Sequence, residues 1–85
     1  MALHLLEHDL LVRLPDLPPS TFRILRSAEW MNGEVRITAP LEELRRLLAE
    51  VMRRFTWPKT RRDRLLLGSA FHRLGEALAP PANRE

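Results

Sequence analysis

The stretch "PLEELRRLLAEVMRRF" (residues 40–55) decides how this chain folds. Apolar residues recur in it every three or four positions, which is the spacing of one face of an α-helix. Acidic residues open the stretch and arginines close it, as the helix dipole favours. We therefore predict a helix over about 40–55 that begins with Pro40 at its first position. Its stripe comprises Leu41, Leu44, Leu48, Val51 and Phe55, widened by Leu47 and Met52.

A second helix is predicted over 61–79. Pro58, within "TWPKT" (56–60), separates it from the first, and Thr60 can cap its start. Its apolar stripe consists of Leu67, Ala70, Phe71, Leu74, Ala77 and Leu78. Two prolines follow, so residues 80–85 are expected to form a loose tail.

The N-terminal part and the centre of the chain are predicted to supply strands. "LLVRLP" (10–15) is apolar with one arginine and ends at a proline, which favours a strand with "LHLL" (3–6) as its candidate partner. "PDLPP" (15–19) is a stiff turn. "EVRITA" (34–39) alternates and is rich in β-branched residues, so it predicts a strand as well.

Residues 20–31, "STFRILRSAEWM", allow two interpretations. In a helix, Ser20 would cap the start and Asn32-Gly33 would end it. In a strand, Asn32-Gly33 would be the two-residue turn of a hairpin, with Trp30 opposite Val35. We favour the helix, because Arg26 would otherwise share a strand face with Phe22, Ile24 and Trp30.

These elements predict one α+β domain over residues 1–79: a small two- or three-stranded sheet with helices packed on one face. The length of 85 residues fits a single domain with a small core. Because so small a sheet has exposed edges and an uncovered side, we expect the protein to form a homodimer.

Composition excludes several classes of protein. The chain has no cysteine, hence no disulfide or thiolate metal site, and no apolar run long enough to span a bilayer. The N-terminal "MALHLLEHDLL" lacks the basic region of a signal peptide. We therefore expect a cytoplasmic protein with no membrane partner. Few amides and seven prolines would suit a thermophilic source, although a GC-rich genome gives much the same bias.

Positive charge is concentrated in "RRFTWPKTRRDR" (residues 53–64), which we call the basic stretch. It carries six basic groups and one acidic group, whereas the whole chain has a net charge of +3. Clustered arginines with an aromatic among them are typical of sites for phosphate and nucleic acid. The candidate anion-binding residues are Arg53, Arg54, Trp57, Lys59, Arg61, Arg62 and Arg64. The same residues would also suit a solvated connector, with Trp57 packed beneath the turn.

Catalytic and metal motifs are weak in this sequence. His4 and His8 have the spacing of a helical metal pair, but an extended segment would hold them too far apart, so we predict no metal and no cofactor. Ser69 in "GSAFHRLG" does not form a nucleophile elbow. Gly68 and Gly75 lie two turns apart on one helix face, which suggests close packing of another helix, from this chain or a second copy.

Three functions follow as hypotheses. The leading one is a non-catalytic binding module that acts as a homo-oligomer. The alternative is nucleic-acid binding through the basic stretch, and a small enzyme is the third and weakest.

Overall fold

The computed structural model describes residues 1–78, so the predicted tail at 80–85 lies outside the described residues. The elements in chain order are β1 (Ala2–His4), α1 (Leu5–Arg13), α2 (Pro19–Arg26), β2 (Glu29–Met31), β3 (Glu34–Arg36), α3 (Leu41–Arg53) and α4 (Arg61–Leu78). The strands form one antiparallel sheet in the order β1-β3-β2. The predicted α+β class is confirmed, with three strands rather than two.

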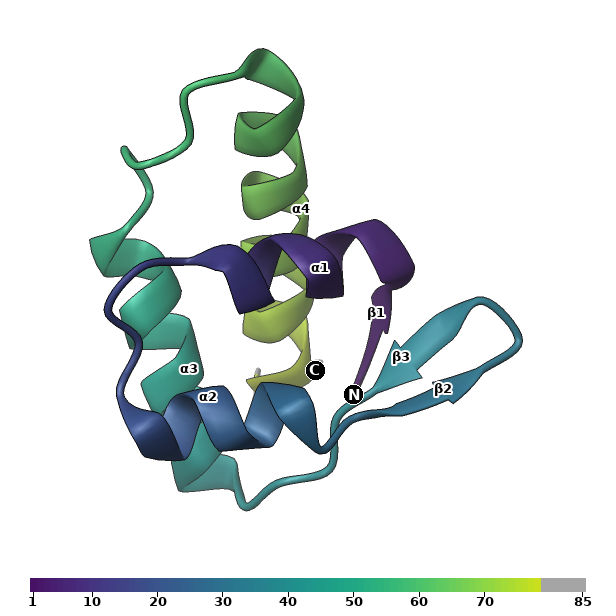
Figure 1. Ribbon diagram of the computed structural model, residues 1–85. Coiled ribbons are helices and arrows are strands. Elements are labelled where there is room, and N and C mark those ends of the chain that lie inside the picture. The colour runs from purple at the N-terminus through teal and green to yellow at the C-terminus, as the bar shows by residue number, and fades with distance from the viewer. Residues whose placement is uncertain (79–85) are drawn as a thin grey trace, which may run out of the picture.

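The helices contribute most of one apolar core. The hairpin of β2 and β3 projects from the side of the helices (Figure 1). α4 contacts both α1 and α3, and α1 also packs on α2 and on the sheet. The predicted stripe of the 40–55 helix supplies the centre of the core, because Leu44, Leu47 and Val51 are all buried. The side chains that meet them from the other elements include Leu3, Leu10, Leu11, Leu25, Leu67 and Leu74.

Both long helices are confirmed, with small differences at their starts. Pro40 precedes α3 instead of occupying its first position, and its carbonyl oxygen accepts hydrogen bonds from Glu43 N–H at 2.9 Å and Leu44 N–H at 3.1 Å. Thr60 caps α4 as predicted, since its Oγ1 accepts a hydrogen bond from Asp63 N–H at 3.1 Å. The last residue predicted for that helix, at position 79, lies outside the described residues.

The predicted strand at 10–15 is wrong, because most of that segment belongs to α1. His4 and Glu7 start this helix with reciprocal capping bonds. His4 Nδ1 accepts from Leu6 N–H at 3.1 Å, and the Glu7 carboxylate accepts from His4 N–H at 2.9 Å. Leu10 and Leu11 then become buried on the inner face of a helix. Only Ala2–His4 of the N-terminal region is a strand, and it pairs with β3.

Residues 20–31 combine both interpretations, so the preference for a helix is right up to Arg26 and wrong for 29–31. The helix begins at Pro19 with no side-chain cap, so Ser20 does not have the predicted capping role. The hairpin turn follows from Asn32 and Gly33, whose φ angles of 50° and 82° are those of a type I′ turn. "EVRITA" is a strand only as far as Arg36, because β2 and β3 pair over three residues each.

Trp30 lies opposite Val35 and Glu29 opposite Arg36, which is the register of the hairpin interpretation. Leu3 also lies opposite Val35, from the other side of β3. These three residues therefore share one face of the sheet, and Trp30 lines a pocket on it together with residues of α1.

Candidate interaction site

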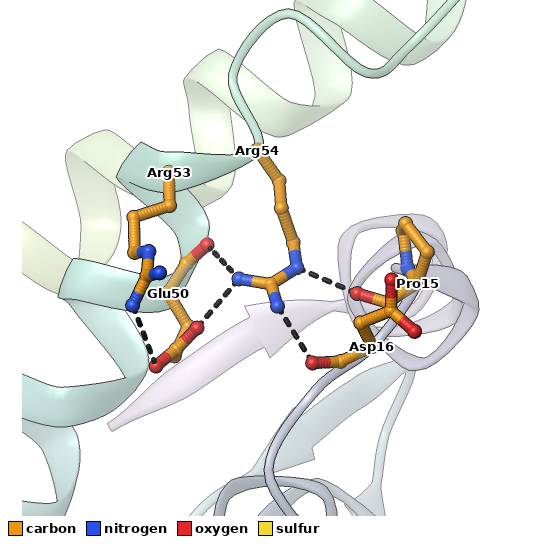
Figure 2. A network of polar contacts seen from close by, with 5 residues as sticks. All are labelled: Pro15, Asp16, Glu50, Arg53 and Arg54. Atoms are coloured by element: carbon orange, nitrogen blue, oxygen red, sulfur yellow. Dashed lines mark hydrogen bonds and ion pairs between the residues drawn. The ribbon is translucent and has the colours of Figure 1, made fainter.

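Arg54 lies in the basic stretch, but its guanidinium is engaged within the fold (Figure 2). Its Nε donates to the Pro15 carbonyl at 2.6 Å, and its Nη2 donates to the Asp16 carbonyl at 2.7 Å. Its Nη1 donates to the Glu50 carbonyl at 2.9 Å and to Glu50 Oε1 at 2.6 Å. The side chain is only 14% exposed. Arg54 therefore joins the end of α3 to the turn after α1, and it is not free to bind an anion.

The other basic side chains stand in solvent. Arg53 is 75% exposed and reaches Glu50 only at 3.9 Å. Within residues 1–78, no ion pair involves the other four, which are Lys59, Arg61, Arg62 and Arg64. Asp63, the one acid among them, lies 3.6 Å from Arg13 of α1. Arg64 Nε lies 3.5 Å from the Pro58 carbonyl oxygen. The basic stretch thus carries five exposed cations with little local compensation from acidic groups.

The two aromatic residues of the basic stretch have different environments. Trp57 is half-buried and packs against the core, as expected for a residue beneath a turn. Phe55 is 43% exposed, and its ring meets that of Phe71 edge-to-face at a centroid distance of 5.0 Å. Trp57 is therefore poorly placed for stacking on a base, and Phe55 forms part of an exposed apolar surface.

That surface continues across the two long helices. Met52 lies one turn before Phe55, and on α4 Leu65, Gly68 and Phe71 follow one another at intervals of three residues. Met52 and Leu65 are among the most exposed large apolar residues of the described chain. We call these five residues the α3–α4 apolar face: Met52, Phe55, Leu65, Gly68 and Phe71.

Gly68 and Gly75 open onto free space in the described part of the protein. Apart from the adjacent residues and the backbone of α4 itself, a Cβ atom built on either glycine has no atom within 4 Å. The structure therefore gives no close approach of α3 at these positions. The predicted role of the two glycines in helix packing stays a prediction that concerns a partner outside this chain.

We expect Gly68→Ala and Gly75→Ala each to raise the free energy of unfolding by up to about 1 kcal/mol, because alanine favours the helix and meets no obstacle here. Urea denaturation of the isolated protein at low concentration measures this. A loss of stability in either variant would contradict the open space seen around these positions.

A second exposed surface surrounds β2, the edge strand of the sheet. All three of its residues are exposed, and Trp30 at 67% is the most exposed large apolar side chain in residues 1–78. Beside Trp30 lies a pocket of about 450 Å³ between α1, α2 and β2. It is lined by Leu5, Leu6, His8, Asp9, Val12, Arg26 and Trp30.

The backbone of Trp30 points to the open side of this edge. In a two-residue hairpin the pair that flanks the turn exchanges hydrogen bonds, and bonding then alternates along the ladder. That flanking pair is Met31 and Glu34, so Trp30 and Val35 form a non-hydrogen-bonded pair. The N–H and C=O groups of Trp30 are therefore available to another strand.

Sequence reasoning missed the buried carboxylate of Glu7, which is only 2% exposed. Besides His4 N–H, it accepts a hydrogen bond from the Ser69 hydroxyl and pairs with Arg73 Nε at 2.9 Å. Burial raises the pKa of Glu7, but the hydrogen bonds from Ser69, His4 and Arg73 outweigh this, so the pKa is lower than usual. The sequence signal for this site is the three-residue spacing of His4 and Glu7, which is that of a capping box. It is recognisable only if histidine is considered as the N-terminal cap of a helix.

Residues 1–78 show neither a metal site nor a membrane-spanning helix. That part of the chain has no cluster of three or more His, Cys, Asp or Glu residues able to hold a metal ion. His4 caps α1, and His8 Nε2 lies 2.7 Å from the Leu25 carbonyl. No helix in the same range has the length and apolar character needed to cross a membrane.

Comparisons with protein-family models, with curated proteins and with solved structures gave no match for this chain.

Proposed function

We propose that this protein is a non-catalytic interaction module that forms a homodimer by pairing its β2 strand with β2 of a second copy. The observation that carries the proposal is the open edge at β2, where Trp30 exposes both its ring and its free backbone groups. Pairing would turn two three-stranded sheets into one sheet of six strands and would remove an edge from each.

An antiparallel pairing centred on Trp30 suits a two-fold axis. The two Trp30 residues would exchange backbone hydrogen bonds, and Glu29 of each copy would face Met31 of the other. No like charges then lie opposite each other across the new strand pair. The ring of each Trp30 would lie on the α1 side of the joined sheet, close to the pocket of its partner.

The charge around this edge supports self-association. Glu29 has Arg36 directly opposite it within the hairpin, and the rim of the pocket carries both Asp9 and Arg26. A nearly neutral surface can meet its own copy without repulsion, whereas a surface of one sign cannot.

Replacing Trp30 with lysine is expected to weaken the dimer at least tenfold, because lysine removes the apolar contact and places like charges at the two-fold axis. Sedimentation equilibrium over a concentration series measures the dissociation constant, which we expect in the micromolar range. The matched control is Leu65→Lys, which changes an equally exposed residue on α4. A wild type that stays monomeric at millimolar concentration, or equal effects of the two variants, would overturn the proposal.

Nucleic-acid binding through the basic stretch is the second candidate, favoured by its exposed cations. It has less support than the sequence suggested. Arg54 is held by backbone carbonyls, and Trp57 packs against the core. Five of the seven candidate residues remain available to phosphate groups, so a salt-dependent contact with a nucleic-acid backbone is the form that this function would take.

A further inference from the structure

We propose that the α3–α4 apolar face, together with the exposed cations of the basic stretch, binds an acidic amphipathic helix of another protein. This goes beyond the homodimer, because it uses a different surface and a partner of different chemistry. It does not depend on dimer formation.

The apolar surface is the first feature that points to a partner. Phe55 and Phe71 join the end of α3 to α4 by their ring contact. Met52 lies one turn before Phe55, and Gly68 and Leu65 precede Phe71 on α4 by three and six residues. Large apolar side chains gathered in this way on a small protein mark a contact surface. A bound helix fits such a surface better than a strand does, because its own apolar stripe can lie along the helices. The open space at Gly68 would let it approach closely.

The second feature is the positive charge beside this surface. Arg53 ends α3, Lys59 lies in the connection, and Arg61, Arg62 and Arg64 begin α4, all of them exposed. Three arginines at a helix N-terminus are unfavourable for the helix dipole, so an acidic partner would relieve local repulsion. A second copy of this face would bring five further cations against these and would repel them.

The apolar residues and the cations together narrow the choice of partner. A nucleic acid would use the cations and leave Met52 and Leu65 without a role, whereas an uncharged helix would use the apolar residues and leave the cations without one. A helix with leucine on one face and glutamate on the other engages both sets. Among macromolecular partners, it is therefore the one that fits the whole surface.

The test uses a fluorescent designed peptide of roughly 18 residues, or five helical turns, with leucine at helical spacing and glutamate elsewhere. Fluorescence anisotropy compares it with a scrambled peptide of the same composition and with a single-stranded oligonucleotide. We expect a micromolar dissociation constant for the designed peptide and binding at least about tenfold weaker for the scrambled one.

Variants separate the two contributions. Met52→Ser and Leu65→Ser change exposed residues, and each should weaken peptide binding by roughly 3- to 10-fold. The double variant Arg61→Glu/Arg62→Glu should weaken it at least about tenfold, more so at low salt. Trp30→Lys should leave it unchanged, so failure of this proposal and failure of the homodimer are distinguishable.

Two results would overturn the proposal. One is equal affinity for the designed and scrambled peptides. The other is tighter binding of the oligonucleotide, with Met52→Ser and Leu65→Ser having no effect on it, which would assign the basic stretch to nucleic acid.

Discussion

Replacing Glu7 with alanine is expected to lower the free energy of unfolding by about 2–3 kcal/mol, a large share of the stability of a domain of this size. The carboxylate of Glu7, which belongs to α1, is buried and accepts hydrogen bonds from His4 N–H of β1 and from Ser69 and Arg73 of α4. Alanine would leave His4 N–H without its partner and would remove half of the capping box of α1. We place the loss below that of a fully buried ion pair because Arg73 is half-exposed.

The contribution of Glu7 depends on pH, with a sign fixed by its lowered pKa. Burial alone would raise that pKa, but the hydrogen bonds from Ser69, His4 and Arg73 bring it below the value in the unfolded chain. The stabilisation is therefore complete above the pKa of Glu7 in the unfolded chain and is lost as the pH falls through its lower pKa in the folded protein. The difference between wild type and Glu7→Ala should accordingly be largest near neutral pH and shrink in acid.

Urea denaturation at neutral and acidic pH measures both effects. The matched control is Glu76→Ala, which removes an exposed carboxylate that, within residues 1–78, pairs with His72 alone and should cost less than about 0.5 kcal/mol. Glu7→Gln should lie between wild type and Glu7→Ala, because glutamine can still accept the His4 hydrogen bond. Equal stabilities for Glu7→Ala and Glu76→Ala would contradict the role of the buried carboxylate.

The second large effect is expected for Arg54→Ala, which should lower the free energy of unfolding by about 2 kcal/mol. The guanidinium donates to three carbonyl oxygens and one carboxylate oxygen, and thereby connects α3 to Pro15 and Asp16 (Figure 2). Asp16 has a φ of 56°, an uncommon angle for a residue other than glycine, and the bond to its carbonyl helps to hold it there.

Arg54→Lys should recover little of this loss. The compact ammonium group of lysine lacks the forked guanidinium that reaches Glu50 on one side and the carbonyl groups of Pro15 and Asp16 on the other. Arg53→Ala is the matched control, since Arg53 is adjacent in sequence yet exposed, and it should cost less than about 0.5 kcal/mol. Denaturant unfolding measures the three variants together. If Arg53→Ala and Arg54→Ala were equally harmless, the contact between α3 and the turn would have no structural importance.

The sequence predicted structure best where an apolar pattern repeated over several helical turns. The stripe of 40–55 repeats often enough to exclude a strand, and α3 was predicted to within two residues at its end. The six residues of "LLVRLP" contain too few periods to separate helix from strand. The capping bond between His4 and Glu7 that starts α1 lies before that segment, so the pattern of 10–15 alone does not contain it.

The candidate site was predictable only as a region. Arg53 and Arg54 look alike in sequence, yet Arg54 binds carbonyl groups 38 and 39 residues away, and such contacts leave no local pattern. The edge position of β2 likewise depends on β1 joining the other side of β3. The Trp30–Val35 register, by contrast, followed from Asn32-Gly33 alone, because a two-residue turn fixes the pairing on both sides.

The most direct test of the proposed homodimer is amide hydrogen exchange at Trp30, followed by NMR as a function of protein concentration. In a monomer this amide lies on the open edge of the sheet and should exchange quickly. We predict that it becomes protected as the concentration rises through the dimer dissociation constant, while the amides of core helices such as α3 stay protected throughout. Fast exchange of Trp30 at every concentration, in a protein that sediments as a dimer, would show that the copies meet elsewhere and would contradict the account.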